Sequence, residues 1–105
     1  MAAGGKPVRL HSEAEAELQE SVNFYRSMAG EQWAVRFKQR VEDAIASIAA
    51  DSCRYRELQE FPGLRAVHVR QFPFSIIYED EPSSIWVVAV AHASRRPGFW
   101  ESRMQ

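Results

Sequence analysis

The chain has 105 residues, which is enough for one hydrophobic core and too short for two. Its hydrophobic fraction of 46% and charged fraction of 26% are typical of a globular domain and exclude collagen-like, coiled-coil and disordered classes. The formal net charge of −1 gives no bulk electrostatic argument for binding nucleic acid or a membrane surface. We therefore expect a single domain over residues 6–105.

Cysteine and histidine usage limits the cofactors. Cys53 is the single cysteine, so neither an intrachain disulfide nor a cysteine-rich zinc site can form. The three histidines lack the spacing of a metal site, and we predict no metal and no other cofactor. No run of residues is apolar and long enough for a signal peptide or a membrane span. We expect a cytoplasmic protein that does not bind membranes.

The N-terminal region predicts a tail, a strand and a helix start. Residues 1–5, Met-Ala-Ala-Gly-Gly, are small and flexible, and we expect them to form a disordered tail. Residues 7–11 predict a short strand, because apolar and polar side chains alternate along them. Ser12 and Glu15 have the spacing of a capping box, which predicts that a helix begins there.

Two stretches with a helical period flank Gly30, which can end a helix in a left-handed conformation. Their apolar residues recur at intervals of three and four: Ala14, Leu18, Val22 and Tyr25, then Trp33, Phe37, Val41, Ala44, Ile45 and Ile48. The acidic Glu13, Glu17 and Glu20 lie outside this stripe. The pattern predicts a helical hairpin, followed by an aperiodic loop over residues 51–63.

From Leu64 the period changes to two, which predicts a strand with Val67 and Val69 on its more apolar face. Residues 74–79 and 85–92 predict a hairpin around a polar turn. The last stretch is apolar on both faces, so we expect a central strand that is covered on both sides. The fold class is therefore α+β, with an N-terminal strand, a helical hairpin on one face of the sheet and a three-stranded antiparallel meander.

This order of elements resembles the RelE/ParE toxin superfamily. Two motifs carry the likeness: Val-His-Val-Arg-Gln-Phe-Pro-Phe-Ser-Ile-Ile-Tyr at 67–78 and His-x-x-Arg-Arg-Pro-x-x-Trp at 92–100. The resemblance covers residues 8–103 and is strongest to toxins of plasmid-stabilization systems. It implies an antiparallel sheet with a helical hairpin packed on it, a concave sheet face that meets the target, and a cognate antitoxin as partner.

Members of the superfamily differ in their targets. RelE-like members cut mRNA in the ribosome, whereas ParE-like members inhibit DNA gyrase without cutting RNA, and the fold does not choose between these activities. We favour a ParE-like inhibitor and keep a ribosome-dependent mRNA endoribonuclease as the alternative. A chain that retains the fold but has lost its toxicity is a third hypothesis.

RNA cleavage through the 2′-hydroxyl requires a general base, a general acid and cations around the phosphate. The candidates for these roles are His68, Arg70, His92 and Arg95. In RelE-like nucleases, cationic residues recur at strand positions that match Ala66, His68, Ser75 and Ala93, and only His68 among these four ionises. This deficit favours a binding toxin, although a register error of one residue would place each side chain on the other face.

Arginine and aromatic side chains near the C-terminus can bind either phosphate or an acidic protein surface. The predicted target-binding residues are Arg65, Arg95, Arg96, Trp100 and Arg103. We expect either Phe99 or Trp100 to cover the core instead, and His92 to form a structural hydrogen bond at the end of its strand.

The helical hairpin carries more apolar surface than one stripe requires. Phe24, Tyr25 and Trp33 are the predicted antitoxin-binding residues, because an amphipathic helix of the partner can cover such a surface. The alternative for Trp33 is that it only closes the hairpin.

Overall fold

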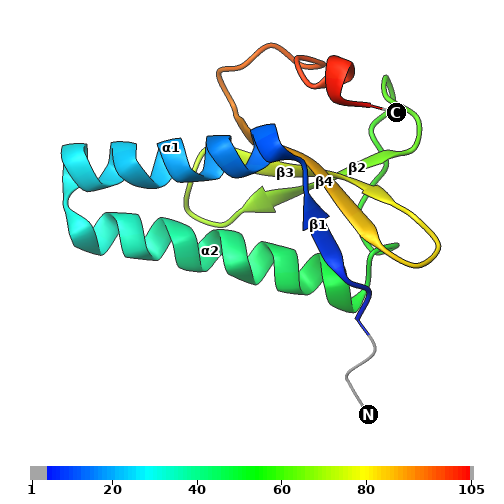
Figure 1. The fold of residues 1–105 in the computed structure, drawn as a ribbon, viewed down its shortest axis with the longest axis horizontal. Coiled ribbons are helices and arrows are strands. Elements are labelled where there is room, and N and C mark those ends of the chain that lie inside the picture. The colour runs from blue at the N-terminus through cyan, green and yellow to red at the C-terminus, as the bar shows by residue number, and fades with distance from the viewer. Residues whose placement is uncertain (1–4, 105) are drawn as a thin grey trace.

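A computed structural model describes residues 5–104 of the chain and confirms the predicted α+β order of elements (Figure 1). The elements are β1 (Val8–Leu10), α1 (Ser12–Ala29), α2 (Glu31–Ala50), β2 (Leu64–Val69), β3 (Phe74–Asp80), β4 (Ile85–His92) and the short 3₁₀ helix η1 (Glu101–Arg103). Most of the predicted tail, residues 1–4, lies outside the described part. No helix among the described residues is long and apolar enough to cross a membrane.

The four strands form one mixed sheet in the order β1-β4-β3-β2. The β2–β3 and β3–β4 pairs are antiparallel and confirm the meander. The expectation of a purely antiparallel sheet is wrong for β1, which pairs with β4 in parallel from Val8↔Ile85 to Leu10↔Val87. Parallel neighbours require a long connection, which the helical hairpin and the other two strands supply. As expected, β4 is a central strand.

Local chemistry explains where the helices begin and end. His11, rather than the predicted Ser12, caps α1, because its Nδ1 accepts a hydrogen bond of 3.0 Å from the amide of Glu13. The predicted start of the helix is therefore correct while the capping residue is wrong. Gly30, with φ of +98°, separates α1 from α2, and its carbonyl accepts from the amide of Ala34 at 3.2 Å.

The sheet is covered by apolar groups on both faces, as the composition of β4 predicts. The helices cover one face, where Phe37 packs between Phe72 and Phe74 with ring centroids 5.1 and 4.9 Å apart. The second apolar layer lies on the other face, beneath Leu58, Phe61 and the C-terminal segment: Leu64, Ile77, Val88, Ala89, Ala91 and Trp100. This arrangement leaves the second face as the place where loops can shape a site.

Candidate functional site

A hollow of about 490 Å³ lies on the face of the sheet that the helices leave uncovered. Strands β2, β3 and β4 form its floor through Ala66, Ser75, Ile77 and Ala91. Residues 56–61 make one wall and residues 93–100 contribute to the other. The hollow is therefore built by the meander and by the two segments that follow α2 and β4.

No side chain of the floor ionises. The registers Ala66↔Ile77 and Ser75↔Ala91 place these four residues on one face, because side chains alternate along a strand. Three of the positions at which the resemblance implies cations in RelE-like nucleases, Ala66, Ser75 and Ala93, line the hollow. Their uncharged side chains supply no group that can transfer a proton, so the ionisable residues of the hollow lie elsewhere in its lining: Arg56, Glu57, Glu60, His92 and Arg95.

Charged side chains stand at the rim of the hollow instead. Arg56, Glu57 and Glu60 come from one wall, and Arg95 comes from the other. The Arg95 guanidinium lies 3.8 Å from the centroid of the Phe99 ring, which suits a cation–π contact. The rim thus combines both signs of charge with an aromatic surface.

Of the four nuclease candidates, His92 and Arg95 line the hollow, whereas His68 and Arg70 do not. His68 is exposed and pairs with Ser75, so it projects on the side of the floor but does not line the hollow. Arg70 is exposed beyond the end of β2. His92 lines the hollow, and its ring also lies 4.9 Å from that of its strand partner Phe74, which packs on the helix side of the sheet. Among the described residues, no side-chain hydrogen bond or ion pair joins any two of these candidates.

The expected structural role of His92 is present in the geometry. Its Nδ1 accepts a hydrogen bond of 2.9 Å from the amide of Ser94, and its carbonyl accepts one of 3.0 Å from the amide of Arg95. These bonds turn the chain where β4 ends. The described residues also bring together no group of three histidine, cysteine, aspartate or glutamate side chains that could hold a metal ion.

The predicted target-binding residues divide into accessible and buried ones. Arg95 and Arg96 are exposed, and Arg65 is half-buried with its Nη1 bonded to the Tyr55 carbonyl. Trp100 and Arg103 are buried, with only 4% and 7% of their surfaces accessible, so neither offers the exposed side chain that the prediction of target contact assumed. Trp100 is thus the aromatic residue that covers the core.

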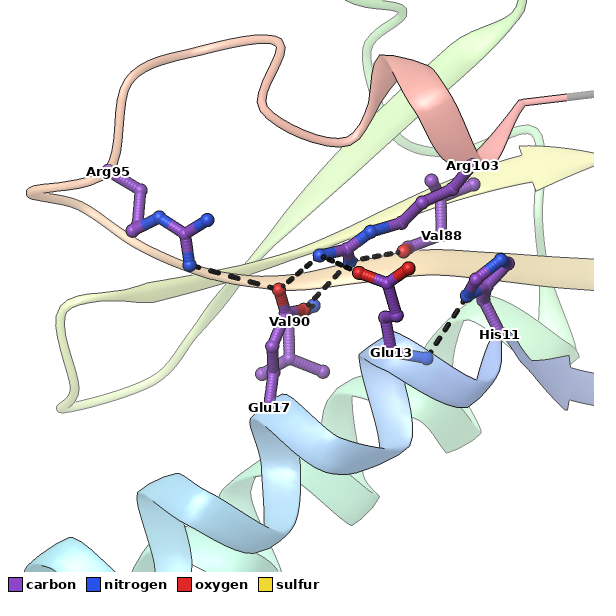
Figure 2. A network of polar contacts seen from close by, with 7 residues as sticks. All are labelled: His11, Glu13, Glu17, Val88, Val90, Arg95 and Arg103. Carbon is purple, nitrogen blue, oxygen red and sulfur yellow. Dashed lines mark hydrogen bonds and ion pairs between the residues drawn. The ribbon is translucent and has the colours of Figure 1, made fainter.

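Arg103 is buried because an acidic side chain of α1 receives it (Figure 2). Its Nη2 lies 2.7 Å from Glu17 Oε2, and its Nη1 lies 3.1 Å from Glu17 Oε1. The hydrogen bond to Glu17 raises the pKa of Arg103, although burial opposes the shift. Sequence patterning did not find this pair, because Glu17 falls outside the apolar stripe of α1 and therefore reads as a solvated residue.

Comparison with known proteins places the chain in a family. The family model described as the ParE toxin of the type II toxin-antitoxin system, parDE, matches residues 8–97. The chain belongs to the ParE toxin family. A search of curated proteins found no match.

Two solved structures support this fold. The chromosomal ParDE toxin-antitoxin system from P. aeruginosa aligns with a TM-score of 0.76 and 16% identity, over 87% of this chain and 99% of that one. The isolated RelE toxin of E. coli aligns with a TM-score of 0.51 and 16% identity, over 93% of this chain and 95% of that one. The expected superfamily is therefore confirmed.

The helices of this ParE-family chain leave large apolar side chains exposed near Gly30. Phe24 is 57% exposed and Trp33 is 45% exposed, and the sequence analysis missed two further residues of this kind, Met28 and Val35. Trp33 also contacts the edge of Phe72, with ring centroids 6.0 Å apart, so it closes the hairpin while remaining accessible. Trp33 therefore closes the hairpin, and its role in binding an antitoxin stays a prediction.

Tyr25 differs from its neighbour Phe24. It is half-buried, and its ring lies 5.1 Å from those of Phe37 and Phe72. Burial raises the pKa of its hydroxyl. Tyr25 therefore belongs mainly to the core and supports Phe24, whose ring centroid lies 5.6 Å away.

Proposed function

We propose that this chain is a toxin that inhibits DNA gyrase by binding it, cuts no RNA itself, and is neutralised by a cognate antitoxin. Membership of the ParE family supports the proposal, and one observation carries the choice against a nuclease. The floor of the hollow, Ala66, Ser75, Ile77 and Ala91, offers no ionisable group, and His92 on its wall already accepts a hydrogen bond at Nδ1 from the Ser94 amide. Cleavage of a phosphodiester requires a general base and a general acid beside the reacting atoms.

The rim of the hollow favours a protein target over a nucleic acid. Glu57 and Glu60 offset the cations Arg56 and Arg95, so the rim lacks the excess of positive charge on which nucleic-acid affinity depends. Arginine and aromatic anchors are the residue types that dominate protein interfaces. Arg95 stacked on Phe99 supplies such an anchor, and Arg96 adds a second exposed cation. We assign target binding to these residues and to the hollow beside them.

The exposed apolar side chains of the hairpin suit the antitoxin. Phe24 and Met28 are one turn apart on α1 and share a face of it, and Trp33 is exposed at the start of α2, whereas Val35, two positions on, faces another side. A soluble protein rarely leaves such groups together in water unless a partner covers them. We assign this surface to an amphipathic segment of the antitoxin, with Tyr25 holding Phe24 from beneath.

A paired assay with the purified chain tests the choice of target. Gyrase supercoiling and cleavage of ribosome-bound mRNA are measured over the same range of toxin concentrations. We expect inhibition of supercoiling with intact mRNA, and weaker inhibition by the Arg95→Ala/Arg96→Ala variant. Lys38→Ala, which removes an exposed cation from α2, is the matched control and should inhibit like the unmodified chain.

Three outcomes contradict the proposal in different ways. Codon-phased mRNA cleavage that is lost in a folded His68→Ala/His92→Ala variant would establish the endoribonuclease alternative. Inhibition that is equally strong in the Arg95→Ala/Arg96→Ala variant would remove the assigned face. Growth that continues after induction without an antitoxin would indicate a chain that has lost its toxicity.

A further inference from the structure

Strand β4 has an edge that its neighbour β1 covers only in part. The parallel pairing with β1 ends at Val87, where the chain turns into α1. Beyond Val87, two side chains bond to the backbone of β4 where a neighbouring strand would otherwise do so. Glu17 Oε1 accepts from the amide of Val90 at 3.0 Å, and Arg103 Nη1 donates to the carbonyl of Val88 at 3.0 Å. Residues from opposite ends of the chain thus complete the sheet.

The Glu17 and Arg103 side chains are only 13% and 6% exposed. Buried charges are tolerated when each is paired and hydrogen-bonded, and a bidentate pair also imposes a defined geometry. Here both carboxylate oxygens of Glu17 meet the Arg103 guanidinium, and Glu13 approaches the same guanidinium at 3.3 Å from a more exposed position. Figure 2 shows Glu17 at the centre of this network, reached from β4, η1 and the turn after β4.

The same carboxylate also reaches the rim of the hollow. Arg95 Nη1 lies 3.9 Å from Glu17 Oε2, on the opposite side from Arg103. Phe99 lies between the two arginines in sequence, and both guanidiniums contact its ring, at 3.8 Å for Arg95 and 5.2 Å for Arg103. Glu17 therefore contacts the C-terminal segment, residues 93–104, near both ends of that segment: Arg95 at its start and Arg103 at its end.

We propose that Glu17 is a positioning residue of the target-binding face. Its carboxylate holds the C-terminal segment against β4 through Arg103 and keeps Arg95 at the rim, beside Phe99. The assignment of the rim to target binding rests on the proposed function. The effect of Glu17 on the C-terminal segment does not depend on what the target is.

Hydrogen exchange tests the effect on the segment. Glu17→Gln keeps an oxygen for the Val90 amide but removes the charge that faces Arg103. The amides of Phe99, Glu101, Arg103 and Met104 are hydrogen-bonded within the segment, so their protection can be followed. We expect them to exchange about tenfold faster in the variant while the amides of α2 keep their rates. Unchanged exchange over residues 94–104 would overturn the proposal.

One control variant and one second test variant complete the experiment. Glu20→Gln removes a carboxylate from an exposed position one turn along α1, where the described residues give it no ion pair, and should leave exchange unchanged. Arg103→Lys keeps the charge but loses the bidentate pairing. We expect it to speed exchange in the same segment, and it replaces Glu17→Gln if that variant does not fold.

A double-mutant cycle separates positioning from general stability. We expect Arg95→Ala to weaken gyrase inhibition about tenfold in the native background and less than about twofold when Glu17→Gln is already present. A residue that only stabilised the fold would lower the active fraction and leave the effect of Arg95→Ala unchanged. Equal effects of Arg95→Ala in both backgrounds would therefore overturn the proposal.

The cycle also distinguishes failure of the inference from failure of the proposed function. If the chain does not inhibit gyrase, the proposed function fails. The double-mutant cycle then uses growth arrest in place of gyrase inhibition. The inducer concentration that arrests growth is measured for each variant, and this requires no knowledge of the target. Coupling between Glu17 and Arg95 in that assay would support the positioning role, and additivity would refute it.

Discussion

Tyr78 ties the loop after α2 to the sheet and makes stability depend on alkaline pH. Its side chain is fully buried, and its hydroxyl donates a hydrogen bond of 2.7 Å to the carbonyl of Ser52. Burial raises the pKa of Tyr78 to about 12, with Arg65 opposing the shift. In the unfolded chain the pKa of a tyrosine is about 10. The unfolded state therefore releases this proton first as the pH rises.

The sign and size of the effect follow from linkage. The contribution of the raised pKa is fully present below about pH 10 and is lost as the pH rises through about 12. With these two values, the free energy of unfolding falls by about 1.4 kcal/mol between pH 8 and 11 on account of Tyr78 alone. Tyr78→Phe lacks this titration. At pH 8 the variant is less stable by about 1–3 kcal/mol, because the Ser52 carbonyl is buried without its donor.

Urea unfolding followed by tryptophan fluorescence provides the assay. The free energy of unfolding is measured for the native chain and for Tyr78→Phe at about pH 8, 10 and 11. We expect the stability advantage of the native chain to shrink by about 1.4 kcal/mol over this range, with most of the loss above pH 10. The free energy of unfolding of Tyr78→Phe is subtracted from that of the native chain at each pH, which cancels the titration of the other groups. A constant difference would show that Tyr78 ionises as easily in the folded chain as in the unfolded one.

Three other substitutions test packing, backbone and partner surface. Phe37→Ala should cost about 3–5 kcal/mol in urea unfolding, because a fully buried ring leaves a cavity. Gly98→Ala should lower the melting temperature more than Gly63→Ala. Both glycines have φ near +90°, but only a Cβ added at position 98 meets another residue, the Phe61 ring at 2.9 Å. Equal shifts in melting temperature would contradict this contact. Phe24→Ser should change stability by less than about 0.5 kcal/mol and weaken antitoxin binding measured by calorimetry; unchanged affinity would place the antitoxin elsewhere.

The periodicity of the sequence predicts the elements of this fold because each buries a regular face. The change of period at Leu64 marks β2, and Gly30 marks the end of α1, as the structure confirms. The direction of β1 could not be predicted in this way, since the same alternation serves a parallel or an antiparallel pair. The cap of α1 was misassigned because His11 also carries a hydrogen-bond acceptor, one residue before the more common Ser12.

The chemistry of the site was harder to predict, because a charged residue looks the same in sequence whether it is solvated or paired. Arg103 and Arg95 belong to one basic segment, yet the first is buried against Glu17 and the second stacks at the rim. The separation of Glu17 and Arg103 by 86 positions leaves no local signal of their contact. The burial of Trp100 depends equally on where the C-terminal segment folds back.

The fold shared with both a ParDE system and a RelE toxin cannot decide the activity, because likeness at 16% identity concerns the backbone. The decision lies in the few side chains that the strands project into the hollow. At Ala66, Ser75 and Ala93 these side chains are small and uncharged, so these positions can accept an apolar anchor and supply no general base. A binding toxin uses such a face through its rim, where the position of Arg95 beside Phe99 decides what it can contact.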